Sequence, residues 1–331
     1  MVDLLTDAGG GRPAGVTLDG TGLVHEALFH RDEQDYAIDI ARFLREGLES
    51  SEPALVAVPG SRLDVLRSML GSDGEGVQFV DMAQAGRNPG RIIPAVLYAF
   101  IQAQPGRRVR VVAEPIWPER SAAEYRAAVQ HEALLNIALA GHEATILCPY
   151  DCRRLGATAL AQARQTHPVL LEGSRRALSA EYRDPRAVAD ESLRFLPDPP
   201  ELWGDMLVFS SSADLPGIRE FVEGRALRAG LRVDRVTDLC LAVTEVATNT
   251  LVHTHAAGVL SLWQDSQTGT LVCEISDSGQ LRDRLVGRIP PHRSQPHGHG
   301  LVLVNELCDL VEIPTGRIGT GTTVRMHMAL G

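Results

Sequence analysis

The stretch Glu245-Val-Ala-Thr-Asn249 decides the fold of the last third of this 331-residue chain. It lies in a segment, 233–252, whose apolar residues recur every three or four positions, and this spacing predicts an amphipathic helix. On such a helix Glu245 and Asn249 share one stripe, one turn apart. An amide oxygen at Asn249 can ligate Mg²⁺, while Glu245 can orient an attacking water or hydroxyl. On its own, however, a pair of this kind is more typical of a solvated helix face.

Three further motifs follow in a fixed order. Asp277-Ser-Gly279 stands at the exit of a strand-like run, where a carboxylate can accept a hydrogen bond from adenine N6. Gly298-His-Gly300 precedes an apolar run that begins at Leu301, and glycines at a helix start expose N–H groups to phosphate oxygens. The closing strand contains Gly319-Thr-Gly-Thr-Thr323, in which either final threonine can bond near the adenine. Each motif alone is also typical of an ordinary turn or strand, so the prediction depends on their order and spacing.

Together these motifs resemble the nucleotide site of the GHKL ATPases. The pattern of Glu245, Asn249 and His253 is similar to the small anti-sigma-factor and serine-kinase branch, and the resemblance covers roughly 207–328. It implies a Bergerat-type α/β sandwich, a mixed sheet with one layer of helices, that binds ATP and Mg²⁺. It also implies that the domain holds a sigma factor inactive, phosphorylates a serine or threonine of an STAS-type anti-anti-sigma partner, or does both. Members of this branch commonly form a homodimer through the sheet.

The resemblance assigns roles to individual residues. Asn249 is expected to hold Mg²⁺, Asp277 to hold adenine, and Glu245 to activate the acceptor hydroxyl. The segment 280–297, rich in Arg, Pro and His, is expected to form a mobile lid over the nucleotide. Leu281 departs from the family pattern, because it replaces a second glycine and predicts a less open loop. The other residues expected to contact the nucleotide are Gly279, Gly298, Gly300, Leu301, Thr322 and Thr323.

A histidine kinase is the competing prediction within the same superfamily. It requires a phosphoaccepting histidine on a helical hairpin just before the ATPase domain. His131-Glu-Ala-Leu-Leu-Asn136 is the candidate phosphoacceptor box, but no proline follows it and no pair of helices leads into residue 207. We interpret this box as part of one helix of the first domain. Two alternatives stay open: a non-catalytic protein-binding module with a vestigial nucleotide site, and a free-standing small-molecule ATPase.

The first domain is predicted at about 21–173. Strand-like runs alternate there with helical patterns, which indicates a parallel sheet covered on both faces. The loop Pro59-Gly-Ser-Arg-Leu-Asp64 follows the first predicted strand, at the position of a P-loop, but lacks the Lys-Ser/Thr pair that holds phosphate and Mg²⁺. Nucleotide hydrolysis is therefore not expected at this loop. The predicted strands are 54–58, 77–80, 109–113 and 144–148, and the predicted helices are 35–48, 63–70, 90–102, 122–139 and 155–164.

Several stretches of this domain resemble a MEDS domain, a sensory module of methanogen, methylotroph and actinobacterial regulators. The resemblance implies a RecA-like three-layer fold and a sensor for a small-molecule ligand, with a hydrocarbon-like compound as one option. The sensory-pocket candidates are His25, Glu114, Trp117 and Tyr150, and the last three lie at or beyond strand ends, where open α/β sheets place their crevice. Trp117 and Tyr150 could equally pack the domain edge. The stretches are His25-Glu-Ala-Leu-Phe-His30, Gly47-Leu48, Ala113-Glu-Pro-Ile-Trp117 and Cys148-Pro-Tyr-Asp151.

The sequence disfavours a metal or haem site. His25 and His30 can be combined with Cys148 and Cys152 on paper, but the spacing Cys-Pro-Tyr-Asp-Cys matches no common zinc pair. The five cysteines lie mostly in apolar segments, as expected for a reduced cytosolic protein.

The expected organisation is a flexible N-terminus at 1–20, the sensory domain at 21–173, a Pro-rich semi-rigid linker at 174–203 with a short helix near 187–195, and the ATPase domain at 204–331. The chain lacks a signal-peptide pattern and any long apolar run, so a cytoplasmic protein without membrane contact is expected. A formal net charge of -10 disfavours direct nucleic-acid binding. That acidity suits docking to a basic partner, such as the nucleic-acid-binding face of a sigma factor.

Overall fold

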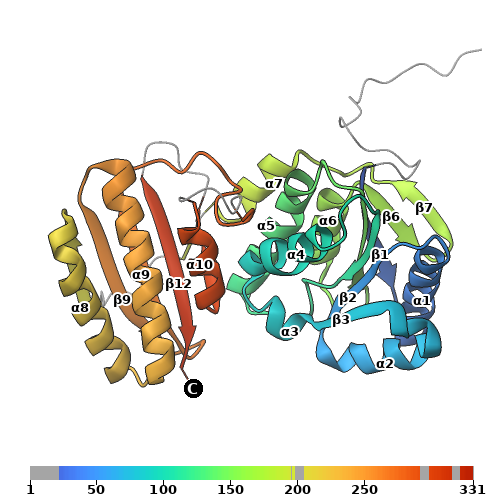
Figure 1. Cartoon of the computed structure of the whole chain (residues 1–331), viewed down its shortest axis with the longest axis horizontal. Helices are drawn as coiled ribbons and strands as arrows, with labels where there is room; N and C mark the ends of the chain where they lie inside the picture. The colour runs from blue at the N-terminus through green and yellow to red at the C-terminus, as the bar shows by residue number, and fades with distance from the viewer. Residues whose placement is uncertain (1–21, 195, 198–204, 291–297, 315–320, 331) are drawn as a thin grey trace, which may run out of the picture.

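The computed structural model describes residues 22–194, 196–197, 205–290, 298–314 and 321–330. In these residues the chain forms two domains that lie side by side, each built on its own sheet (Figure 1). The first sheet is formed by strands between residues 23 and 178, and the second by strands between 205 and 329. The predicted N-terminal segment 1–20 lies outside the described residues.

Seven strands of the described chain form the first sheet, in the order β3-β2-β4-β5-β1-β6-β7. The first six of these strands pair in parallel, and β7 pairs antiparallel with β6 at the edge. The two long central strands, β1 and β5, place His25 opposite Ile146 and Ala27 opposite Cys148. The strands are β1 (Leu23–His30), β2 (Ala54–Val58), β3 (Val77–Asp81), β4 (Val109–Ala113), β5 (Ala144–Asp151), β6 (Val169–Glu172) and β7 (Arg175–Leu178).

Helices cover both faces of this sheet, as the alternation of strands and helices predicts. Apolar side chains of α1 and α2 pack on one face, and those of η3 and α5 pack on the other. A capping box starts α5, because the Ser121 hydroxyl and the Glu124 carboxylate each accept a hydrogen bond from the other's backbone N–H. The helical elements are α1 (Glu33–Glu49), α2 (Gly60–Leu70), η1 (Gly71–Gly76), α3 (Met82–Ala85), η2 (Pro89–Arg91), the π-helical η3 (Ile92–Tyr98), α4 (Ala99–Gln102), α5 (Ala122–Ala138), α6 (Ala157–Thr166) and α7 (Pro185–Ser192).

Three strands of this sheet were not predicted: β1, β6 and β7. Polar residues obscure β1, yet His25, Glu26 and His30 are all buried. Because β1 comes first, the loop 59–64 follows the second strand of the chain and does not occupy the position of a P-loop. The segment predicted as a linker also differs, because β7 extends the first sheet and α7 packs against α5.

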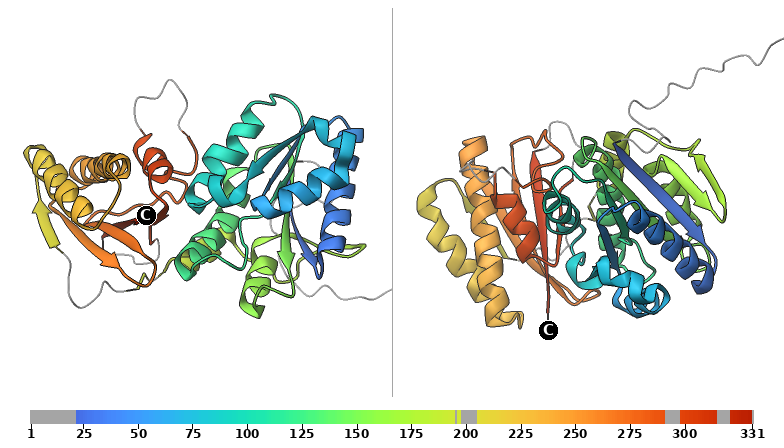
Figure 2. Two further views of the ribbon diagram at one scale, coloured as in Figure 1. Left: turned by 90° about the horizontal axis from the view of Figure 1, so that it is seen from below. Right: turned by 45° about the vertical axis from the view of Figure 1, so that its right-hand side comes forward.

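The second domain contains five strands in its described residues, all paired antiparallel in the order β11-β12-β10-β9-β8. The mixed sheet that the family resemblance implies is therefore not present among these strands. Three helices cover one face of the sheet (Figure 2, left). The elements are β8 (Asp205–Phe209), η4 (Ser212–Asp214), α8 (Leu215–Arg228), α9 (Val233–Thr254), β9 (Gly258–Asp265), β10 (Thr270–Asp277), α10 (Gly300–Leu307), β11 (Leu310–Glu312) and β12 (Thr322–Ala329). None of the helices in the described residues has the length and apolar character needed to cross a bilayer.

The two domains meet where η2 and α5 of the first face α10 and the segment 280–290 of the second. Asn88 Nδ2 donates a hydrogen bond to the backbone oxygen of Asn305 on α10, at 2.9 Å. Arg288 donates to the backbone oxygen of Pro89 at 3.2 Å and to Gln130 Oε1 at 2.9 Å. All the side chains that make these bonds are buried. A buried polar contact of this kind fixes the relative position of the two partners, because each unpaired group would lose its hydrogen bonds.

Candidate functional site

The first predicted motif lies on α9, at the border between its buried and exposed faces. Val243 and Val246 pack into the core, whereas Glu245 and Asn249 are half-buried. Both polar side chains face the start of α10. A Cβ atom added to Gly300 would lie 2.9 Å from Glu245 Oε2 and 3.4 Å from Asn249 Nδ2. Glycine at position 300 therefore leaves free the space beside these two side chains.

The carboxylate of Asp277 is held at the end of β10 by two hydrogen bonds. Its Oδ2 accepts from the hydroxyl of Thr250 on α9 at 2.7 Å, and its Oδ1 accepts from the backbone N–H of Gly279 at 2.8 Å. Thr250 is the residue after Asn249, so the same helix positions both predicted ligand groups. Each carboxylate oxygen keeps a further lone pair, with which Asp277 can accept a bond from an exocyclic amine.

The last motif adjoins Asp277 through the sheet. Thr322 lies opposite Asp277 in the β10–β12 register, and Thr323 lies opposite Ser276, with the two hydroxyl oxygens 3.0 Å apart. Gly321 has a φ of +92° and passes so close to Asp277 that an added Cβ would lie 1.8 Å from its backbone oxygen. Only glycine fits at this position. Gly319 lies outside the described residues.

The third motif forms the start of α10. Gly298 and His299 are exposed, and α10 begins at Gly300. The first turn of a helix presents backbone N–H groups without intrahelical partners, and these can bind an anion. Leu301 packs its side chain into the core of the second domain, so only its backbone is placed to meet a nucleotide. His253, near the end of α9, is exposed.

The described part of the predicted lid, 280–290, is anchored on the first domain. Leu285 and Ile289 pack against the core of that domain, while Val286 packs against the core of the second. Arg284 forms an ion pair with Asp190 of α7. The prediction of a mobile lid was therefore wrong for these residues, because it gave weight to their Arg and Pro content and overlooked the apolar anchors. The rest of the predicted lid, 291–297, lies outside the described residues.

Glu114 and Trp117, two of the sensory-pocket candidates, occupy separate environments. The buried Glu114 carboxylate pairs with Arg62 and accepts a hydrogen bond from the Tyr36 hydroxyl at 3.2 Å. Burial raises the pKa of Glu114 to about 7, although the Arg62 guanidinium opposes this shift. Trp117 is half-buried under the guanidinium of Arg120, which lies 3.7 Å from the ring centroid.

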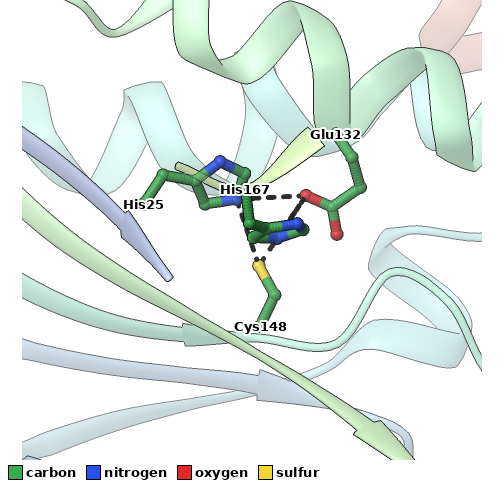
Figure 3. A group of neighbouring side chains, drawn as sticks. All are labelled: His25, Glu132, Cys148 and His167. Carbon is green, nitrogen blue, oxygen red and sulfur yellow. Dashed lines mark hydrogen bonds and ion pairs between the residues drawn. The ribbon is translucent and has the colours of Figure 1, made fainter. Parts of the chain in front are cut away.

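The other two sensory candidates, His25 and Tyr150, meet at the carboxylate of Glu132 on α5. His25 Nε2 lies 3.1 Å from Glu132 Oε2, and the Tyr150 hydroxyl donates to Glu132 Oε1 at 3.0 Å. Cys148 and His167 complete a compact group whose donor atoms all lie within 4.8 Å of one another (Figure 3). His25 and Cys148 were singled out as candidates from the sequence, whereas Glu132 and His167 were not. No local motif joins these residues, because four separate elements contribute them.

The histidine-kinase alternative depends on His131, which lies next to Glu132 on α5. Its side chain is buried, and neither ring nitrogen has a hydrogen-bond partner among the described residues. Burial lowers the pKa of His131 to about 3, so the ring is neutral at physiological pH. A phosphoaccepting histidine must reach ATP from the protein surface, and His131 does not meet this requirement.

Two cavities in the first domain differ from the predicted sensory pocket. One, of about 540 Å³, opens near Glu26, Arg110 and Arg176. The other, also of about 540 Å³, lies at the end of β1 beside His30 and Cys152. None of His25, Glu114, Trp117 and Tyr150 lines either cavity.

Comparison with protein families matches each domain separately. Residues 24–168 match the MEDS model, described as the MEthanogen/methylotroph, DcmR Sensory domain. Residues 209–328 match the model of the histidine kinase-like ATPase domain. No curated protein matches the chain. A sensory domain joined to an ATPase domain indicates a regulatory, ATP-binding signalling protein. The chain thus consists of a MEDS sensory domain followed by a histidine kinase-like ATPase domain of the GHKL type.

Proposed function

We propose that this chain is an ATP-binding anti-sigma factor, a serine/threonine kinase of an STAS-type anti-anti-sigma partner, or both, under the control of its MEDS domain. The observation that carries the proposal is the grouping of Glu245 and Asn249 around the space left by Gly300. The burial of His131 adds support, because it removes the phosphoacceptor that a histidine kinase would need. We also propose a cytoplasmic location for this regulator.

The residues present fit a nucleotide. Asp277 has free lone pairs for the adenine amine, and Thr322 lies beside it in the sheet. The start of α10, which follows the exposed Gly298 and His299, would supply backbone N–H groups for phosphate. Asn249 would hold Mg²⁺, which would neutralise charge on the phosphates. The glycine at 300 places no side-chain atom against Glu245 and Asn249.

Glu245 is the proposed general base. Its carboxylate would accept the proton of a serine or threonine hydroxyl on the partner while that oxygen attacks the terminal phosphorus of ATP. The new P–O bond forms as the bond to the leaving ADP breaks. A half-buried position suits this role, because the carboxylate remains accessible to a protein substrate while α10 partly shields it from water.

Control by the MEDS domain would act through α10 and the segment 280–290. Asn305 lies on the same short helix as Gly300, and it accepts a hydrogen bond from Asn88 of the MEDS domain. Arg288, which is bound to Gln130 of α5, follows Gly287, whose backbone oxygen accepts a hydrogen bond from Asn305 Nδ2 of α10 at 3.2 Å. Both contacts connect the sensor to the part of the nucleotide site that would touch phosphate. A shift of α5 or η2 would therefore change the position of the predicted phosphate-binding turn.

The open edge of the second sheet is the proposed homodimer contact. Strand β8 pairs only with β9 in the described residues. Val208 is 67% exposed and Met206 is 49% exposed, both on this edge strand. Exposed apolar side chains on an unpaired edge favour association with another protein surface. A change of Val208 to Lys should lower the oligomeric mass measured by sedimentation if the edge forms the contact.

The proposal is tested by incubating full-length protein with ATP, Mg²⁺ and candidate STAS proteins from the same genome. Phosphorylation of serine or threonine on one of them, lost in Glu245→Ala, is the expected result. A matched control is Glu220→Ala, which changes an exposed carboxylate on α8. Phosphotransfer that survives in Glu245→Ala would remove the proposed base. A phosphohistidine product would instead support the histidine-kinase alternative.

A non-catalytic binding module is the second candidate, and Leu281 favours it. This half-buried side chain stands where the family pattern places glycine, close to Gly279 and Asp277. A module of this kind would bind a sigma factor with equal affinity in the parent and in Glu245→Ala, and it would yield no phosphorylated product. The phosphorylation assay, run beside a sigma-factor binding assay, separates the two functions.

A further inference from the structure

We propose that His25, Glu132, Cys148 and His167 form a structural zinc site inside the MEDS domain. The four side chains come from β1, α5, β5 and the turn after α6, and each is fully buried. Their donor atoms converge on one point (Figure 3). Two imidazoles, one thiolate and one carboxylate are all ordinary zinc ligands.

The spacing of the donor atoms fits tetrahedral coordination. With metal–ligand bonds of about 2.0 to 2.3 Å, neighbouring ligand atoms in a tetrahedron lie roughly 3.3 to 3.8 Å apart. Glu132 Oε2 lies 3.1 Å from His25 Nε2, 3.4 Å from His167 Nε2 and 3.8 Å from Cys148 Sγ. Cys148 Sγ lies 3.5 Å from His25 Nε2. Only small shifts of these side chains would bring all four to bonding distance of one ion.

Hydrogen bonds to the outer ring nitrogens prepare both histidines for metal binding. His167 Nδ1 lies 2.8 Å from the backbone oxygen of Ala163, which can only accept, so Nδ1 carries the proton. His25 Nδ1 lies 3.1 Å from Asn136 Oδ1. That amide is oriented by its Nδ2, which donates to the backbone oxygen of Thr166 at 2.8 Å. In the neutral tautomer each ring therefore turns the lone pair of Nε2 into the cluster, as in known metal sites.

An ion would satisfy His167 Nε2, the cluster atom that makes no hydrogen bond to the described residues. This nitrogen is buried and points toward Glu132. The Tyr150 hydroxyl already holds Glu132 Oε1, which leaves Oε2 to face the cluster. Two neutral imidazoles, one carboxylate and one thiolate carry a formal charge of −2, which a divalent cation would neutralise. Burial of the resulting neutral group costs far less than burial of an unpaired charge.

Zinc is the metal that this donor set favours. A closed set of four protein ligands with mixed nitrogen, sulfur and oxygen donors suits tetrahedral Zn²⁺, which has no preference for square-planar or octahedral geometry. The absence of solvent exposure at all four residues indicates a structural site with no open position for substrate. The ion would tie α5 to the central strands β1 and β5.

The test uses full-length protein without a polyhistidine tag. Metal content is measured by mass spectrometry, and Co²⁺ serves as the spectroscopic probe, added to chelator-treated protein and also during refolding from denaturant. The parent should bind about one Zn²⁺ or Co²⁺ per chain, with a tetrahedral visible spectrum and a thiolate-to-cobalt charge-transfer band. Folding of each metal-free sample is checked by circular dichroism.

Two variants of the cluster and one control variant locate the site. Cys148→Ser should lose the charge-transfer band, while Cys152→Ser, a change at a cysteine outside the cluster, should keep it. His167→Gln should weaken binding by more than the roughly 10- to 100-fold that loss of an outer-shell partner costs. A folded parent that takes up neither metal by either route would overturn the proposal. So would a charge-transfer band that is unchanged in Cys148→Ser, because the ion would then lie elsewhere.

Discussion

The nucleotide site of the second domain and the buried cluster of the first both gather polar donors, but they differ in access. Glu245 and Asn249 are half-buried beside the half-buried Gly300, whereas His25, Glu132, Cys148 and His167 have no exposed surface. The first arrangement can be reached by a ligand from solvent. The second has room only for a proton or a single ion. Polar side chains therefore indicate different ligands according to the space that surrounds them.

Helix α5 lies between these two regions. It carries Glu132, which faces the buried cluster, and Gln130, which accepts a hydrogen bond from Arg288 of the second domain. Arg126, further toward the start of the helix, forms an ion pair with Glu312 of the second domain at 2.9 Å. A change inside the first domain can reach the ATPase domain through this one helix.

The largest effect is expected from a substitution in the nucleotide site. Asn249→Ala should abolish the Mg²⁺-dependent part of ATP binding, because the amide oxygen of Asn249 is the proposed ligand of the ion. The measurement is ATP binding by calorimetry with and without Mg²⁺. Thr248→Ala, which changes the preceding half-buried residue of α9, is the matched control. An unchanged Mg²⁺ dependence in Asn249→Ala would show that the metal is held elsewhere.

The buried carboxylate of Glu114 predicts that the stability of the first domain depends on pH. Burial raises the pKa of Glu114 from its ordinary value of 4.5 to about 7. Between these pH values the native state binds more protons at Glu114 than the unfolded state, so this residue lowers stability as pH rises. Arg62 and Tyr36 face the carboxylate, and Asp151 also adds to the raised pKa.

Glu114→Gln should remove this dependence. Relative to the parent, the variant should gain about 3 kcal/mol in free energy of unfolding between pH 4.5 and pH 7. The substitution also weakens the contact with Arg62, which lowers the free energy of unfolding of the variant at both pH values. This loss is the same in the two measurements, so it does not alter the change between pH 4.5 and pH 7. Urea unfolding at the two pH values measures it, with Glu49→Gln on the exposed side of α1 as the control. A pH-independent difference would show that Glu114 is ionised throughout.

The contact between the two domains is tested at Arg288. Arg288→Ala should lower the free energy of unfolding by about 2 kcal/mol, because the buried Gln130 side chain and the Pro89 carbonyl lose their donor. It should also increase amide hydrogen exchange in the segment 280–290. Burial lowers the pKa of Arg288 to about 10, so the guanidinium is still charged at neutral pH. Exposed Arg282→Ala is the control, and equal exchange in both variants would argue against domain coupling.

The smallest expected effect concerns the space in the nucleotide site. Gly300→Ala places a Cβ 2.9 Å from Glu245 Oε2, which must move away. ATP affinity should fall about fivefold, equivalent to about 1 kcal/mol. Gly217→Ala in α8 is a fair control, because its Cβ would meet nothing within 4 Å. Equal ATP affinity in both variants would show that this space is not used by the ligand.

The sequence predicted the regular elements of the nucleotide site because its signals are local. The apolar spacing around Glu245 located α9, and alternation located β10 with Asp277 at its end. The partners of these residues were less predictable. Thr250, which positions Asp277, is an unremarkable helical threonine in the sequence. The anchoring of the segment 280–290 also escaped prediction, because its contacts lie on another domain.

The buried cluster could not be predicted from sequence for a different reason. Its four residues are separated by up to 142 positions, from His25 to His167, and only the strand order places β1 next to β5 and β6. Strand β1 was itself not predicted as a strand, because His25, Glu26 and His30 interrupt its apolar pattern. Polar residues inside a core strand are uncommon, and here they coincide with the cluster.

Titration of the full-length protein with ATP in a calorimeter, with and without Mg²⁺ and beside Asp277→Asn, is the measurement we would make first. The proposed nucleotide site predicts saturable, Mg²⁺-dependent binding that is lost in Asp277→Asn. The amide has one acceptor oxygen where the carboxylate has two, and Thr250, Gly279 and the adenine amine would all donate to this side chain. Equal binding by the parent and the variant would contradict the assignment of Asp277. Absence of binding in the folded parent would contradict the nucleotide site itself.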